Sequence, residues 1–197
     1  MENRVITIGR QFGSGGREIG QLLSESLGIP FYDRDLIELA VEKSGIDLET
    51  LEKHDEKPVN RWFYSIPSQP NRLTGYGMPI ADTLFVAQSE IIRELAQKES
   101  CIIIGRCADY VLREHPDLIS LFIHAPMEER IKRIMRRYSL DDRQAKEFIR
   151  RTDKERASYY NYYTEKKWSG MESYHFCIDS SIFGVSGTVE KLLRLAG

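Results

Sequence analysis

Short apolar segments alternate along the chain with stretches that carry apolar residues at helical spacing. The apolar segments are residues 4–9, 30–32, 101–105, 118–124 and 174–179. Most of them are continuous rather than alternating, which is typical of strands buried on both faces of a parallel sheet. Helical stripes fall between them, at Ile19, Leu22, Leu23 and Leu27, at Leu84, Ile91, Ile92 and Leu95, and at Val189, Leu192, Leu193 and Leu195. The pattern predicts an α/β fold with a doubly wound, five-stranded parallel sheet flanked by helices.

One segment interrupts this alternation. Residues 55–81 contain four of the seven prolines and show no clear period. A loop of that length inside a compact domain is usually functional or mobile. We therefore interpret residues 34–97 as an insertion between the second and third strands, helical at both ends and irregular in the middle. The length of 197 residues fits one domain that carries this insertion.

The charge of the chain is unevenly distributed. In total 28 Lys and Arg oppose 30 Asp and Glu, which gives a net charge of −2. Residues 130–167 hold 13 basic and 6 acidic residues, whereas the remainder holds 15 basic and 24 acidic ones. The near-neutral total argues against a polybasic protein, and the hydrophobic share of 41% argues against global disorder. The cationic block 130–167 therefore needs an explanation of its own.

The cysteines and the short apolar runs indicate in which cellular compartment the protein is found. Cys101, Cys107 and Cys177 are an odd number without CxxC spacing and lie in or beside apolar runs, so we expect reduced, buried thiols. The apolar run near the N-terminus is too short for the core of a signal peptide. No run approaches the roughly 18 residues that a membrane-spanning helix needs. These features predict a cytoplasmic protein with no membrane partner.

The most informative motif is the glycine-rich run in ITIGRQFGSGGREIG. A β-branched strand leads into Gly13, Ser14, Gly15 and Gly16, and an amphipathic helix begins directly behind them. Glycine is needed where backbone N–H groups turn inward around an anion. A helix N-terminus adds further N–H donors and the positive end of its dipole. The motif predicts a phosphate cradle; the alternative is a tight turn that binds nothing.

The run departs from the P-loop pattern GxxxxGK[ST] in two respects. No lysine lies near the loop, and Arg17 follows its last glycine. Glu18 stands about where the pattern has the Ser or Thr that binds Mg²⁺. Arg17 could pair with phosphate oxygens, although it is bulkier than lysine. Glu18 could ligate Mg²⁺ through its carboxylate, or could simply be a first-turn residue favoured by the helix dipole.

Further motifs follow in an order that resembles a known family. The run GSGGREIGQLLSESLGIPFYDRDLI is similar to the opening of nucleoside monophosphate kinases, cytidylate kinases in particular, whose second strand ends in Asp, here Asp33. CIIIGRCADYVL resembles their third strand with its Gly-Arg-Asp motif, although Cys107 follows Arg106 and the nearest carboxylate is Asp109. IRRTDKERASYY resembles the arginine-rich return of their lid. The lysine-free loop resembles that of the cytidylate kinase-like group.

This resemblance implies a fold, a reaction and a set of roles. It implies one P-loop kinase-like domain over residues 1–197, with 34–97 as an acceptor-binding insertion and 130–167 as a basic lid. It implies transfer of the γ-phosphoryl group of ATP, with Mg²⁺, to a nucleoside monophosphate such as CMP. The implied donor-binding residues are Gly13, Ser14, Gly15, Gly16, Arg17 and Glu18, and Glu18 is also a candidate Mg²⁺ ligand. The implied catalytic residues are Arg17, Arg136, Arg150, Arg151, Asp153 and Arg156. The implied substrate-binding residues are Asp33, Arg106 and Asp109. Phosphoryl transfer depends on positioning and electrostatics, which a lid rich in arginine would supply.

Each motif has a second interpretation that the residues leave open. The cationic block could be a solvated helix pair or a nucleic-acid surface. Arg106 could pair with Asp109 or Glu114, Asp33 could cap a helix over residues 34–43, and Asp153 with Arg156 could be only a helical i, i+3 pair. The tyrosines 159, 160, 162 and 163 are more typical of packing than of stacking on a base. Because the loop lacks lysine, a non-catalytic nucleotide-binding regulator is the main alternative to an enzyme.

Overall fold

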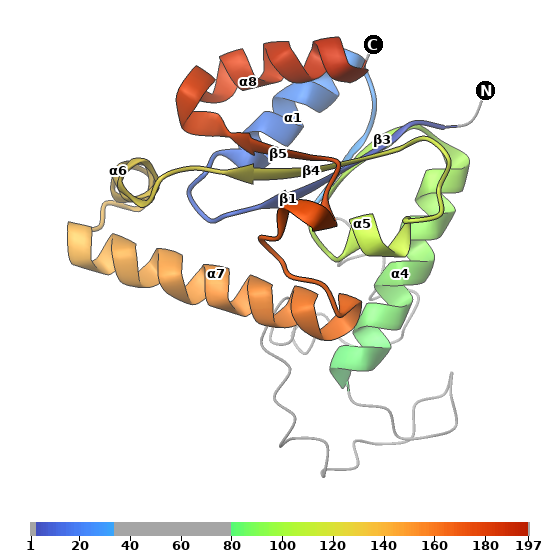
Figure 1. Cartoon of the computed structure of the whole chain (residues 1–197), viewed down its shortest axis with the longest axis horizontal. Coiled ribbons are helices and arrows are strands. Elements are labelled where there is room, and N and C mark those ends of the chain that lie inside the picture. Colours follow the sequence, from blue (N-terminus) through green and yellow to red (C-terminus); the bar gives the residue numbers. More distant parts are fainter. Residues whose placement is uncertain (1–2, 34–79, 197) are drawn as a thin grey trace.

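One parallel sheet of five strands forms the centre of the molecule (Figure 1). The computed structural model describes residues 3–33 and 80–196. The strands are β1 (Val5–Arg10), β2 (Phe31–Tyr32), β3 (Cys101–Ile104), β4 (Leu118–His124) and β5 (Phe176–Asp179), in the order β2–β3–β1–β4–β5. This confirms the predicted fold class and the five predicted strands. Since β1 lies between β3 and β4, the strand order reverses there, and such sheets bind ligands at the carboxyl edge of that point.

The central strands are buried because helices cover both faces of the sheet. Val5 of β1 pairs with Cys101 of β3 on one side and with Leu118 of β4 on the other. Alternate residues enter different cores: Val5 packs with the helices over residues 80–98 and 108–111, whereas Ile6 and Ile8 pack with those over 16–27 and 180–196. Apolar side chains are therefore needed at successive positions, which explains the continuous rather than alternating segments.

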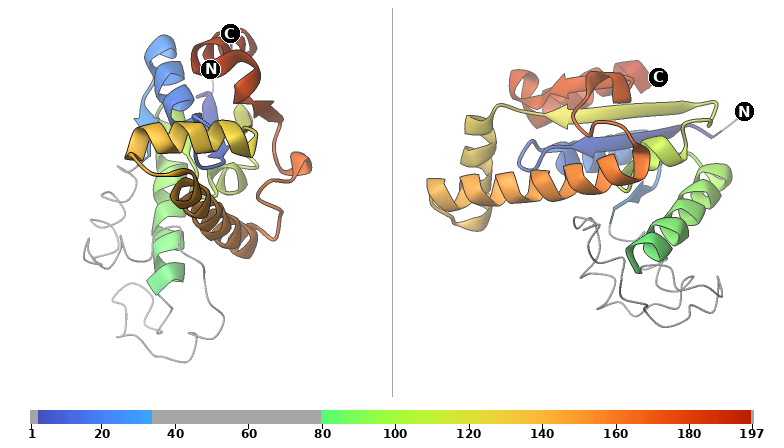
Figure 2. Two further views of the ribbon diagram at one scale, coloured as in Figure 1. Left: turned by 90° about the vertical axis from the view of Figure 1, so that its left-hand side faces the viewer. Right: turned by 60° about the horizontal axis from the view of Figure 1, so that its bottom comes forward.

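Helices α1 (Gly16–Leu27) and α8 (Ser180–Ala196) cover one face of the sheet. Helices α4 (Ile80–Lys98) and α5 (Ala108–Val111) cover the other face, as Figures 1 and 2 show from three directions. The stripes predicted in α1 and α4 are confirmed, because Ile19, Leu23, Leu84 and Ile92 are buried. In α8 the prediction is wrong at one position: Leu195 is half exposed, since the helix ends beside it at Ala196.

The cationic block forms a helical hairpin at the carboxyl edge of the sheet. Helix α6 (Met127–Tyr138) follows β4, and α7 (Asp142–Thr164) returns beneath the sheet (Figure 1). The turn between them ends at Asp141, whose carboxylate accepts a hydrogen bond from the Gln144 amide at 2.8 Å and so caps α7. The cationic block is therefore a pair of helices joined by a short turn.

The tyrosine-rich end of α7 packs rather than facing solvent. Tyr159 and Tyr160 are buried with Phe122 of β4, and Tyr174 joins the same cluster. The Tyr163 ring stacks on Phe85 of α4 with centroids 4.0 Å apart. This confirms the packing interpretation of these tyrosines and fixes the C-terminal half of α7 against the sheet and α4.

Two other expectations are tested only in part. The C-terminal end of the predicted insertion is helical, since α4 begins at Ile80. The helix expected over 34–43 lies outside the described residues, as does the irregular segment 55–81 except for its last two residues, which belong to α4. Cys101, Cys107 and Cys177 form no disulfide, and the first two are buried as expected. Within residues 3–33 and 80–196, no helix combines the length and apolarity needed to cross a membrane.

Candidate functional site

The glycine loop between β1 and α1 has a defined conformation. Gly13 and Gly15 have φ angles of +82° and +83°, which residues with a side chain rarely adopt. Ser14 is buried; its hydroxyl donates to the Gln11 carbonyl at 2.8 Å, and its own carbonyl accepts a hydrogen bond from the Ser180 hydroxyl at 2.6 Å. These bonds tie the loop to α8 and fix it without a ligand.

Several amide groups of the loop remain available to an anion. Among the described residues, none accepts a hydrogen bond from the amides of Gly13, Gly15, Arg17 or Glu18. Gly15 is the N-cap of α1, so these donors surround the positive end of the helix dipole. The arrangement fits the predicted phosphate cradle.

Two residues of α7 hold the backbone of the loop in place. The Asp153 carboxylate accepts a hydrogen bond from the Phe12 amide at 2.8 Å and pairs with the Arg130 guanidinium at 2.5 Å. Arg130 is 5% exposed and also donates to the Phe12 carbonyl. The guanidinium of Arg156 donates to the Arg10 carbonyl at 3.1 Å. Asp153 and Arg156 therefore position the loop, which is a more specific arrangement than an i, i+3 helix pair.

One arginine of α6 reaches the mouth of the cradle. The Arg133 guanidinium pairs with the Glu18 carboxylate at 2.8 Å. It lies so near the loop that a Cβ at Gly15 would come within 3.2 Å of it. Sequence reasoning placed Arg133 in the basic lid but did not separate it from its neighbours; its contact with Glu18, 115 residues away, leaves no local pattern.

The other predicted lid arginines stay on the surface. Arg136, Arg150 and Arg151 are exposed on the same helical hairpin. Arg136 donates to the Lys132 carbonyl, and Arg151 lies over the Phe148 ring at 5.3 Å. No hydrogen bond or ion pair joins these three arginines to the described residues of the glycine loop. Their catalytic role stays a prediction.

Arg17 points toward β2. Its Nε lies 2.6 Å from the Asp33 carboxylate, and its guanidinium lies 5.8 Å from the centre of the Phe31 ring. Asp33 is nearly buried, whereas the Arg17 side chain is half exposed. The structure thus joins two predicted site residues, one expected for the donor and one for the acceptor, into one ion pair.

Arg106 and Asp109 lie at the carboxyl end of β3, one strand from the loop. Arg106 and Cys107 are consecutive left-handed residues with φ of 56° and 54°, a conformation that costs about 1–2 kcal/mol per residue and often accompanies a functional site. Tyr160 donates a hydrogen bond to the Asp109 carboxylate at 2.6 Å. Burial raises the pKa of the Asp109 carboxyl above its ordinary value, and the hydrogen bond from Tyr160 offsets part of that effect.

A small cavity lies beside these residues, at the ends of β1 and β3. It measures about 20 Å³, enough for a single water molecule, and its polar lining comes mainly from Arg10, Arg106, Arg156, Asp109 and Tyr160. The predicted site residues Arg106 and Arg156 thus converge with Arg10 where β1 and β3 end, which is the switch point of the sheet.

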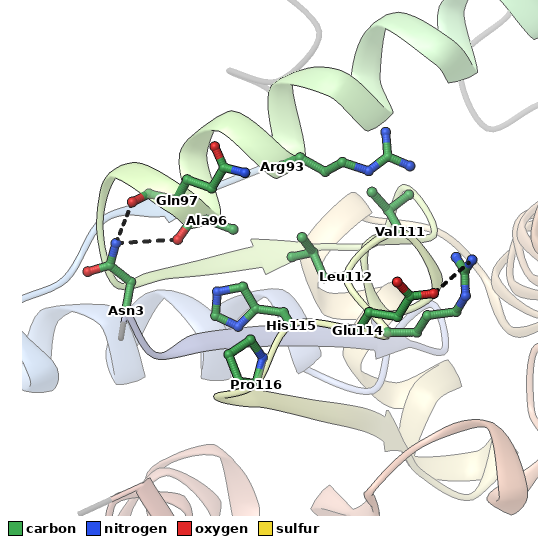
Figure 3. Close-up of a pocket in the computed structure, with 10 residues that line it drawn as sticks. Asn3, Arg93, Ala96, Gln97, Val111, Leu112, Glu114, His115 and Pro116 are labelled. Atoms are coloured by element: carbon green, nitrogen blue, oxygen red, sulfur yellow. Dashed lines mark hydrogen bonds and ion pairs between the residues drawn. The ribbon is translucent and has the colours of Figure 1, made fainter. Parts of the chain in front are cut away.

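A larger cavity of about 580 Å³ lies at the opposite, amino edge of the sheet (Figure 3). Arg93 and Gln97 of α4 form one side, and Leu112, His115 and Pro116 the other. None of these residues borders the glycine loop, so this cavity is separate from the candidate site.

The described residues contain no cluster of three or more His, Cys, Asp or Glu side chains with the geometry of a metal centre. Glu18 is the carboxylate beside the cradle and fits a role as one ligand of a Mg²⁺ ion that nucleotide phosphates would also ligate. This ion would meet a carboxylate already paired with Arg133.

Comparisons with known proteins agree with this geometry. A model described as the cytidylate kinase-like family matches residues 5–182. An uncharacterized protein from Eubacterium ventriosum is similar in structure, with a TM-score of 0.71, 27% identity and 98% of each chain covered. A shikimate kinase from Bacteroides thetaiotaomicron has a TM-score of 0.57 at 14% identity over 98% of each chain. One from Acinetobacter baumannii, in complex with shikimate, has a TM-score of 0.54 at 16% identity over 100% of this chain and 93% of its own. No curated protein matches the chain significantly.

Proposed function

The chain belongs to the cytidylate kinase-like family, and we propose that it transfers the γ-phosphoryl group of ATP, with Mg²⁺, to a small phosphorylatable acceptor, a nucleoside monophosphate such as CMP. The observation that carries this proposal is the glycine cradle: the amides of Gly13, Gly15, Arg17 and Glu18 donate to no described acceptor, and arginines of the cationic block hold or border the loop. This combination is what a donor phosphate chain requires.

The donor would bind along the loop and the start of α8. The amides of Gly13, Gly15, Arg17 and Glu18 would hold its phosphates, and Mg²⁺, when bound, would neutralise charge between them. Ile182 and Phe183 are 69% and 52% exposed just beyond Ser180, which is bonded to the loop. Exposed apolar side chains beside a phosphate cradle offer a surface on which the base of the nucleotide can pack.

The acceptor would bind at the ends of β2 and β3. Arg106 would orient an acceptor phosphate, since a guanidinium matches phosphate oxygens in a bidentate way. Asp109 would accept hydrogen bonds from a sugar or other hydroxyl, and Asp33 would hold Arg17 in the direction of the acceptor. Arg136, Arg150, Arg151 and Arg156 would then surround the transferring group as the hairpin approaches it.

A phosphotransfer screen tests this proposal. Purified protein is incubated with ATP and Mg²⁺ and with CMP, dCMP, UMP, AMP or a panel of small hydroxy acids, the last because similarly folded kinases include shikimate kinases. We expect phosphorylated product with one acceptor class, and loss of that product in Arg106→Ala. As a matched control, Arg113→Ala removes an exposed arginine of the same segment that pairs with Glu114, and should leave turnover unchanged. ATP binding without turnover on any acceptor would refute the kinase.

The second candidate is a nucleotide-binding regulator on the same fold. Its support is that lysine is absent from the loop and Arg17 is paired with Asp33. Calorimetry separates the two: a regulator binds ATP with unchanged stoichiometry over hours, whereas a kinase consumes it once the acceptor is added.

A further inference from the structure

The first residue of α1 cannot carry a side chain. A Cβ at Gly16 would lie 2.6 Å from the Cβ of Arg10 and 3.3 Å from its Cγ, and real Cβ atoms essentially never approach within 3.0 Å. If Gly15 is taken as the last glycine of the P-loop pattern, the lysine of the pattern would stand at position 16, where the Cβ and Cγ atoms of Arg10 exclude it. The residue that excludes a lysine there is itself a cation.

Arg10 lies between the glycine loop, which is the proposed donor site, and the cavity at the end of β3, which is part of the proposed acceptor site. It is the last residue of β1, and its side-chain stem crosses the N-terminus of α1 at Gly16. It also lines the cavity that holds Arg106 and Arg156, and its carbonyl is held by the Arg156 guanidinium. Its stem thus starts where a lysine side chain at Gly16 would start.

Two other cations, Arg17 and Arg133, lie in or beside the loop and have carboxylate partners. Arg17, the next residue of α1, is directed at Asp33 by a 2.6 Å ion pair. Arg133 approaches from the opposite side of the loop, beside Gly15, and bonds to Glu18. Each of these two guanidinium groups therefore has a carboxylate partner among the described residues.

We propose that Arg10 supplies the phosphate-bridging cation of this lysine-free loop, contacting the β- and γ-phosphate oxygens of the donor from the end of β1. This inference rests on the proposed donor site. During transfer the bond from the β,γ-bridging oxygen to the γ-phosphorus breaks as the bond from the acceptor oxygen forms, and Arg10 stabilises the charge on both phosphates without exchanging a proton. Its fork of donors can engage two oxygens at once, which lysine cannot do.

Nucleotide binding by calorimetry tests the inference. Arg10→Gln should weaken ATP binding by about 10- to 100-fold, the range expected for one charge-assisted contact, and should leave AMP binding within 2-fold because AMP lacks the β- and γ-phosphates. Arg10→Lys should recover part of the loss. Arg143→Gln serves as the matched control, since this arginine of α7 is exposed and pairs only with Glu147 among the described residues.

Moving the cation back to the helix gives a sharper test. Arg10→Gly removes the atoms that exclude a side chain at position 16, and the nearest remaining atom is then the Ile123 Cβ at 3.1 Å. The double variant R10G/G16K should bind ATP at least 10-fold more tightly than R10G alone, whereas G16K in the native background should be unstable.

Two results would overturn the inference. One is unchanged ATP affinity and kcat in Arg10→Gln; the other is an equal loss of affinity for ATP and AMP, which would assign Arg10 a purely structural role. Turnover by the native chain tests the proposed function separately. If the native chain transfers phosphate and the Arg10 variants have the same ATP affinity and kcat, only the role of Arg10 is refuted. A native chain that binds no ATP refutes both.

Discussion

The buried clamp on the glycine loop offers the most direct test of how this site is held. Asp153→Ala would leave the Arg130 guanidinium, 5% exposed, without its carboxylate and would leave the Phe12 amide without its acceptor. Removing one partner of a buried ion pair typically costs about 3–5 kcal/mol. The Asp153 side chain is 16% exposed, so water screens the pair only weakly. We expect a loss of free energy of unfolding of about 3 kcal/mol or more.

Urea unfolding followed by far-UV circular dichroism measures this loss. With a slope of about 2 kcal/mol per M, the midpoint should fall by about 1.5–2.5 M. The melting temperature should fall by about 6–20 °C, from about 2–4 °C per kcal/mol for a chain of this size. Glu147→Gln is the control on the same helix, because it breaks the exposed Arg143–Glu147 pair and should cost less than about 1 kcal/mol.

A double-mutant cycle separates the pair from its surroundings. Replacing both partners by apolar residues, as in R130M/D153L, removes the buried charge altogether and should recover a large part of the loss in either single variant. A loss in Asp153→Ala no larger than in Glu147→Gln would show that the pair is not buried in solution. Strict additivity of the two single losses would show that Arg130 and Asp153 do not act as a unit.

Three further predictions follow from single contacts. Gly16→Ala should destabilise the fold by about 1–3 kcal/mol through overpacking against Arg10, which thermal unfolding measures. Arg133→Gln should weaken binding of ATP–Mg²⁺ several-fold while changing the free energy of unfolding by less than about 1 kcal/mol, because its pair with Glu18 is largely solvated. Asp109→Asn should become increasingly stabilising relative to the native chain as pH rises from about 4. The pKa of the Asp109 carboxyl in the folded protein lies above its ordinary value of 3.8, so its ionisation lowers the free energy of unfolding of the native chain, whereas asparagine does not ionise. Urea midpoints of both chains between pH 4 and 8 measure that difference, and a constant difference would contradict it.

The sequence was sufficient where the determining contacts are local or periodic. The five strands follow from short apolar segments, and the phosphate cradle follows from glycines directly before an amphipathic helix. Both features can be recognised without the tertiary structure. Burial of a strand on two faces requires apolar residues at successive positions, and a positive φ favours glycine. Asp153 and Arg156 were found through a resemblance, while their contacts with the Phe12 and Arg10 backbone required the fold.

The rest of the site depends on contacts between distant residues. Arg17 was predicted to face the donor, and nothing in its neighbourhood reveals that Asp33, 16 residues on, holds it at the end of β2. Arg10 carried no motif at all. Its importance follows from the packing of β1 against the first turn of α1. Side chains at positions 10 and 16 would occupy the same space there, and this space is left to Arg10 because residue 16 is glycine.

The arginines of the cationic block have two separate roles. The excess of 13 basic over 6 acidic residues therefore does not equal the charge that is available to a ligand. Arg130 and Arg156 are bound to the backbone of the loop, so part of the positive charge is used inside the protein. The buried Arg130 cannot leave Asp153 of α7 cheaply, and this pair ties α7 to the loop. Arg136, Arg150 and Arg151 remain exposed and cost little to keep charged. Movement of the hairpin toward a ligand must therefore concern its solvent-exposed turn around Ser139, while the segment of α7 from Asp153 onward stays with the sheet.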